Sequence, residues 1–91
     1  MPLYVSTPGA RVRKSGEMLL IEVDDRSSDG SKGEATKTEV PIIDVSELAL
    51  FGPVSLTTPT LHELLSRDIP VNWFSTGGWL MGHTVGTGRR N

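Results

Sequence analysis

The chain of 91 residues contains no cysteine, and aromatic residues make up only 5% of it. Without thiols it has no disulfide framework, no thiolate metal site and no cysteine nucleophile. No apolar run is longer than four residues, whereas a membrane-spanning helix needs about 20 and a secretory signal needs about 7–15. We therefore expect a cytoplasmic protein.

A surplus of positive charge is also absent. Nine Lys and Arg residues face 11 Asp and Glu residues, which gives a formal net charge of −2 and a pI near 5.6. A protein that binds nucleic acid unaided usually carries a basic domain. Any contact with DNA must therefore come from a local cationic patch or from other parts of a larger assembly.

The apolar residues that remain are spaced for one mainly β domain, α+β by strict count. Alternation with period two and short turn sequences separate the predicted strands. These strands cover 3–5, 10–15, 18–23, 40–43, 45–51, 71–75 and 79–85. Because Pro41 cannot donate to a ladder, it marks a strand start or a sheet edge. We expect a small β-sandwich-like domain of about six to seven strands over residues 1–86.

One short helix is predicted near residues 58–67. Thr57 or Thr58 is suited to cap it, Pro59 suits the first helical position, and leucines at 61, 64 and 65 give one apolar stripe. By contrast, residues 24–39 contain a single aliphatic side chain, Ala35. We expect that segment to be a solvated loop without chemistry of its own.

The side chains that carry chemistry do not form a catalytic set. The two histidines, His62 and His83, lack the partners that a zinc site requires. No serine stands in a nucleophile elbow, and no glycine spacing matches a phosphate-binding loop; Gly77 and Gly78 predict a turn instead. We therefore predict no catalytic residue and no metal ligand in this chain.

Basic side chains offer two candidate contacts with DNA. Arg11 and Arg13 alternate along one strand and share a face, and Lys14 follows them. Guanidinium groups match phosphate geometry, but cations on a strand also discourage edge pairing, and both interpretations stay open. Arg89 and Arg90 lie among flexible glycines and form the second candidate contact or solubilise a linker.

Aromatic side chains cluster around one predicted turn. Trp73, Phe74 and Trp79 fall within seven positions, which predicts either the centre of packing or an interface hot spot. Trp73 and Phe74 must point to opposite faces of a strand, so one face is free to meet another protein. The candidate interface residues are Phe51, Trp73, Trp79 and Met81.

Several segments resemble the N-terminal domain of the CRISPR-associated adaptation integrase, the metal-dependent endonuclease that inserts spacers into a CRISPR array. They are the opening from Leu3 to Glu17, the run 50–58, the leucines of 61–65, and Ile69–Trp79 with its Ile-Pro-Val, Phe-Ser and Gly-Gly sequences. The resemblance spans nearly the whole chain except 24–38. Pro8 stands where some members place a tyrosine wedge, and Asp68 stands where a glycine is expected after the helix.

The resemblance implies a β-rich domain over 1–86 and, at 87–91, the start of a linker to a helical domain. In the family that helical domain holds the Glu, His and acidic ligands of a divalent metal, Mg or Mn, so no cofactor is expected here. Implied partners are a second integrase copy, a small ferredoxin-like CRISPR subunit, the CRISPR exonuclease and double-stranded prespacer DNA. The implied role is dimerisation and DNA positioning during spacer acquisition, a step of antiviral defence in prokaryotic cytoplasm.

An alternative of a different class is a stand-alone β-rich interaction module or inhibitor without a DNA role, which the acidic pI favours. A small independent enzyme is the third possibility, and the lack of a nucleophile–base or metal set argues against it.

Overall fold

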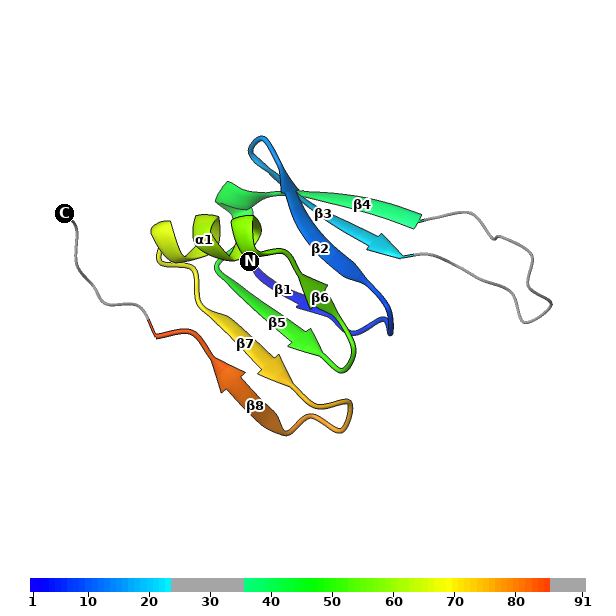
Figure 1. Ribbon diagram of the computed structural model, residues 1–91. Coiled ribbons are helices and arrows are strands. Elements are labelled where there is room, and N and C mark those ends of the chain that lie inside the picture. Colours follow the sequence, from blue (N-terminus) through cyan, green and yellow to red (C-terminus); the bar gives the residue numbers. More distant parts are fainter. Residues whose placement is uncertain (24–35, 86–91) are drawn as a thin grey trace.

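Two four-stranded sheets and one α-helix make up the described part of the chain, residues 1–23 and 36–85 of the computed structural model (Figure 1). Sheet A has the order β1 (Pro2–Val5), β5 (Glu47–Phe51), β7 (Val71–Phe74), β8 (Leu80–His83). Sheet B has the order β4 (Thr36–Pro41), β3 (Met18–Val23), β2 (Arg11–Ser15), β6 (Ser55–Leu56). Helix α1 spans Thr58–Ser66, and a 3-10 turn, η1, spans Ile42–Asp44. The predicted mainly β fold with one helix is confirmed.

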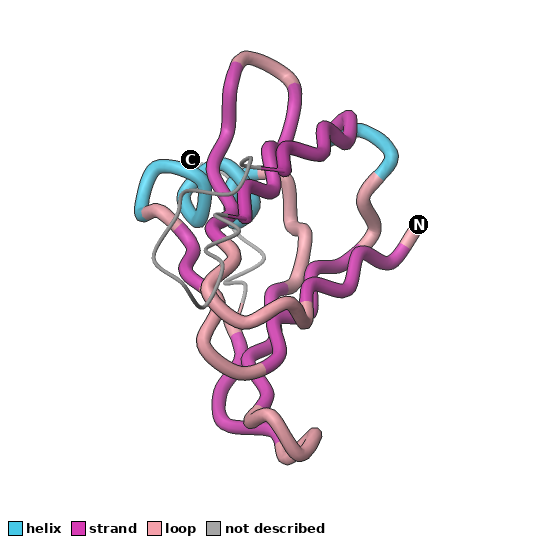
Figure 2. Tube along the Cα trace, turned by 90° about the vertical axis from the view of Figure 1, so that its right-hand side faces the viewer, coloured by secondary structure: helices cyan, strands magenta, loops and turns pink. Residues whose placement is uncertain are grey.

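The sheets share one apolar layer. Strand register places Val12 and Leu19 on the inner face of sheet B, and Leu48, Leu50 and Val71 on the inner face of sheet A. All five side chains are buried and belong to the same core cluster. In Figure 2 the two helical segments lie on opposite sides of the view, with strands between them. Because side chains alternate along a strand, filling this layer commits the other face of each sheet to the surface.

Helix α1 closes the end of the layer where β5 and β7 begin (Figure 1). Its buried Leu64 and half-buried Leu61 pack in the core. Thr57, one of the two threonines predicted to cap the helix, is the N-cap, and because the helix begins at Thr58, Pro59 is its second residue rather than its first. The threonine hydroxyl makes no capping hydrogen bond; it meets the Thr60 hydroxyl at 2.6 Å instead.

The helix ends in a left-handed residue that is not glycine. Asp68 has φ +57°, and its N–H donates to the Leu65 carbonyl at 3.1 Å while the Ile69 N–H donates to the Leu64 carbonyl at 2.9 Å. This pair of hydrogen bonds is the Schellman motif. Ile69 and Leu64 are both buried in the core, so the motif also fixes the direction in which the chain enters β7.

Three segments differ from the sequence prediction. Strand β4 begins at Thr36, inside the segment 24–39 predicted to be a loop, because its residues pair with β3 from Val23 to Met18. The apolar residues Ile42 and Ile43 form η1 rather than a strand, and Pro41 ends β4 at the edge of sheet B. The two-residue strand β6 was not predicted, since only its parallel pairing with β2 makes it a strand.

An ion-pair network joins α1 to the β2–β3 hairpin. Glu63 accepts hydrogen bonds from Arg67 Nε at 2.7 Å and from Lys14 Nζ at 3.2 Å, and Arg67 Nη2 reaches Glu17 at 2.5 Å. The hydrogen bond from Arg67, followed by that from Lys14, lowers the pKa of Glu63 below its ordinary value of 4.5. The network therefore favours the ionised carboxylate in the folded chain.

The first prediction concerns the helix end. Asp68→Gly should be more stable than Asp68→Ala by about 1 kcal/mol, because a left-handed backbone penalises any side chain with a Cβ and not glycine. Both variants lack the carboxylate, so the comparison isolates the backbone effect. Urea unfolding followed by circular dichroism measures the difference. Equal stabilities would show that Asp68 does not hold the left-handed conformation.

The second prediction concerns acid stability. A lowered folded-state pKa adds stability above the unfolded pKa, and that stability is lost as pH falls through the folded pKa. Glu63→Gln should therefore destabilise the chain at pH 7 and flatten the decline in its urea midpoint between pH 5 and pH 2. Glu39→Gln is the matched control, because Glu39 makes no ion pair with another described residue. An acid decline as steep in Glu63→Gln as in the unsubstituted chain would contradict the prediction.

Candidate nucleic-acid interface and aromatic face

The outer face of sheet B carries charged side chains in two rows that cross β2, β3 and β4. Register aligns Arg11, Glu22 and Lys37 in one row, and Arg13, Leu20 and Glu39 in the next. The predicted sharing of one face by Arg11 and Arg13 is confirmed. Adjacent strands lie about 4.8 Å apart, so Arg11 and Lys37 flank Glu22 at roughly 10 Å from each other by backbone position. We call these side chains the cationic face: Arg11, Arg13, Glu22, Lys37 and Glu39.

Glu22 is the centre of this face. Arg13 Nε donates to its Oε1 at 2.5 Å and Arg13 Nη2 to its Oε2 at 3.4 Å, while Lys37 Nζ lies 3.8 Å from Oε2. The Arg13 hydrogen bond is the main cause that lowers the pKa of Glu22 and raises the pKa of Arg13. Charges of Arg13, Lys37 and Arg11 also lower the Glu22 pKa. Glu22 therefore stays ionised among three cations.

Positive charge is in surplus on the cationic face. Arg11, Arg13 and Lys37 oppose only Glu22 and Glu39, and Arg11 is exposed with no ion pair to any residue in the described ranges. A sheet face that exposes Arg11 and Lys37 suits contact with phosphates, which needs charge and no base reading.

The other residues predicted to contact DNA are not part of the cationic face as the structure describes it. Lys14 lies on the inner side of sheet B, opposite Leu19 in register, and pairs with Glu63 of α1. Arg89 and Arg90 lie outside the described residues. Lys37 was missed in the sequence because it falls in the segment interpreted as a loop. The alternation of Thr36, Lys37 and Thr38 was the available signal for a strand there.

Aromatic side chains occupy the outer face of sheet A. Phe51 and Phe74 stack with ring centroids 4.6 Å apart, and Tyr4 meets Phe51 edge-on at 6.3 Å. Register puts Leu80 beside Phe74. Tyr4 is 62% exposed and Leu80 55%, and the four strands contain no lysine or arginine. We call Tyr4, Phe51, Phe74 and Leu80 the aromatic face.

The predicted interface residues lie in three different places. Phe51 lies on the aromatic face, while Trp79 and Met81, at and beside the β7–β8 turn, are 77% and 72% exposed. Trp73 lies on the inner face of sheet A, half-buried against the core, and Phe74 takes the outer position, as strand alternation requires. Tyr4 was missed because its proximity to Phe51 depends on the pairing of β1 with β5.

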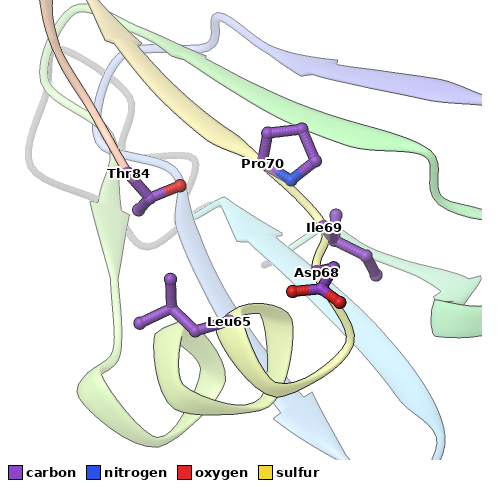
Figure 3. A pocket seen from close by; sticks show the side chains of 5 residues that line it. All are labelled: Leu65, Asp68, Ile69, Pro70 and Thr84. Atoms are coloured by element: carbon purple, nitrogen blue, oxygen red, sulfur yellow. The ribbon is translucent and has the colours of Figure 1, made fainter. Parts of the chain in front are cut away.

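A shallow cavity of about 170 Å³ lies between the end of α1 and the start of β7 (Figure 3). Leu65, Asp68, Ile69, Pro70 and Thr84 line it. The Thr84 hydroxyl accepts a hydrogen bond from the Val71 N–H at 3.0 Å, so this hydroxyl has a structural role in holding the strand. Ligand pockets are usually 300–1,000 Å³, so this cavity is smaller than an ordinary ligand pocket, and Asp68 is the one carboxylate among its five lining residues.

A cluster of metal-ligating side chains is absent from the described ranges. Within residues 1–23 and 36–85, no group of three or more His, Cys, Asp or Glu side chains gathers to hold an ion. The divalent metal of the resembled integrase does not fit the residues described here. Among these residues, no helix has the length and apolar character that crossing a membrane requires.

Comparisons with known proteins agree with this architecture. The model of the family "CRISPR associated protein Cas1" matches residues 3–91. The CRISPR-associated exonuclease Cas4/endonuclease Cas1 fusion of Geobacter sulfurreducens is 48% identical over 91 residues, which are 100% of this chain and 15% of that relative. The chain thus spans a small part of that relative's length.

Solved structures share the fold at low sequence identity. A Cas1 protein from Thermotoga maritima superposes with a TM-score of 0.75 at 19% identity, over 100% of this chain and 25% of that chain. The Cas1 of a structure named TtCas1-DNA complex superposes with a TM-score of 0.64 at 23% identity, over 100% of this chain and 28% of that chain. Since the family model matches nearly every residue, the chain belongs to the Cas1 family and forms its β-rich N-terminal domain.

Proposed function

We propose that this domain positions DNA and joins subunits for a CRISPR adaptation integrase whose catalytic residues lie outside the chain. The observation that carries the proposal is the surplus of cations on the outer face of sheet B, around Glu22. Membership of the Cas1 family and the DNA-bound relative support it. In this proposal the divalent metal and its ligands belong to the helical domain that the family resemblance implies.

DNA contact through this face is electrostatic and independent of sequence. Arg11 and Lys37 project from strands on either side of β3, so one duplex backbone lying across the strands meets both. Phosphate contacts fix the register and orientation of a duplex without reading its bases. That matches the task of an integrase that must accept prespacers of any sequence.

The aromatic face supplies the contact between subunits in this proposal. Exposed aromatic and aliphatic side chains without nearby lysine or arginine suit an apolar protein surface better than a nucleic acid. The proposed partners are a second integrase copy and the small ferredoxin-like subunit. The name of the Geobacter relative includes an exonuclease, Cas4, and we propose a CRISPR exonuclease as a further partner.

A second candidate function is a protein-interaction module without a DNA role. The aromatic face and the net charge of −2 favour it. The two functions differ in what the cationic face binds, which the following prediction tests.

The third prediction is that Arg11→Ala with Lys37→Ala weakens binding of a 30-base-pair duplex and reduces the slope of log K against log salt by about 1.8, because each lost phosphate contact removes about 0.9. Fluorescence anisotropy over several salt concentrations measures the slope. Lys14→Ala is the matched control on the opposite side of sheet B and should leave the slope unchanged. If the double variant keeps the salt slope of the unsubstituted chain, DNA does not bind to this face and the interaction module is favoured.

The fourth prediction concerns self-association. We expect the chain to form dimers in sedimentation equilibrium, and Tyr4→Arg with Leu80→Arg to raise the dimer dissociation constant at least tenfold by placing charge in an apolar contact. Ile43→Arg is the control, since Ile43 is equally apolar, 85% exposed and located on η1. Dissociation by Ile43→Arg, and not by the double variant, would move the interface away from sheet A.

A further inference from the structure

The cationic face contains a carboxylate, Glu22, whose negative charge repels the phosphates of DNA. Glu22 is flanked in register by Arg11 and Lys37, and its two oxygens engage Arg13. Removing Glu22 would leave three cations on adjacent strands. Its presence therefore weakens the phosphate contact that the same face is proposed to make.

Glu22 interacts in a different way with each of its three cationic neighbours. Arg13 gives it two hydrogen bonds, through Nε and Nη2. Lys37 lies 3.8 Å away, beyond hydrogen-bonding distance, with a side chain 52% exposed. Arg11 acts on Glu22 only through its charge. Of the three cations, Arg13 is the one that gives Glu22 hydrogen bonds, through two of its five N–H donors.

Exchange of Glu22 for a phosphate at Arg13 is unfavourable. A phosphate that approaches Arg13 must either displace a carboxylate held by two charge-assisted hydrogen bonds or lie beside it with like charge. A phosphate that contacts Arg11 or Lys37 does not have to displace a hydrogen-bonded carboxylate. Because Arg13 holds Glu22 ionised, protonation does not release the arginine near neutral pH.

We propose that Glu22 masks Arg13, so that Arg11 and Lys37 contact the DNA backbone while Arg13 makes no phosphate contact until the carboxylate is removed. The inference rests on the proposed DNA role and adds to it a residue that sets the strength of the contact. Glu22 is a positioning residue in this account: it acts on DNA through Arg13.

The fifth prediction tests the mask on the full chain with the same 30-base-pair duplex. Glu22→Gln should tighten binding about three- to tenfold at 50 mM salt and steepen the salt slope by about 0.9, one additional phosphate contact. Arg13→Gln alone should leave the salt slope unchanged, because Arg13 makes no phosphate contact while Glu22 is present. Arg13→Gln added to Glu22→Gln should return the slope to that of the unsubstituted chain. Thermal unfolding of each variant confirms that the fold is retained.

Glu39→Gln is the matched control, since it changes the net charge equally on the same face without a hydrogen bond to Arg13. If Glu39→Gln steepens the salt slope as much as Glu22→Gln does, the effect comes from the overall charge and the mask is wrong. A salt slope reduced by about 0.9 in Arg13→Gln alone would also overturn it. If the Arg11 and Lys37 double variant binds like the unsubstituted chain, the proposed DNA role fails as well; if only the Glu22 results fail, that role stands.

Discussion

The apolar layer between the two sheets is the constraint on which the other features depend. Val12 and Leu19 fill it from sheet B, and Leu48, Leu50 and Val71 fill it from sheet A. Strand residues alternate between faces, so every residue next to a core position is directed outward. Packing of the core thereby fixes the position of Arg11 and Arg13 on one side, and of Phe51 and Phe74 on the other.

The two outer faces differ in chemistry because the outward positions of their strands differ. Sheet B presents a row of cation, carboxylate and cation across β2, β3 and β4. Sheet A presents stacked aromatic rings and has no lysine or arginine in its strands. Charge therefore lies on one side of the domain and apolar surface on the other, and the proposed function assigns the duplex to sheet B and the protein partner to sheet A.

Local patterns in the sequence predicted what depends on near neighbours. Alternation placed Arg11 and Arg13 together, separated Trp73 from Phe74, and located the helix from its proline and leucines. Pairing between distant segments was not predictable in this way. Lys37 joins Glu22 only because β4 pairs with β3, and Tyr4 joins Phe51 only because β1 pairs with β5. The helix end shows the same limit, since Asp68 occupies the left-handed position usual for glycine.

Chemical-shift mapping by nuclear magnetic resonance tests the central claim, that the two faces serve different partners, most directly. A duplex is titrated into the ¹⁵N-labelled chain at low salt, and the amide shifts of all strands are followed. The account predicts shift changes concentrated in β2, β3 and β4, with β1, β5 and β7 unaffected. Changes concentrated in sheet A, or none at concentrations that saturate binding, would contradict it.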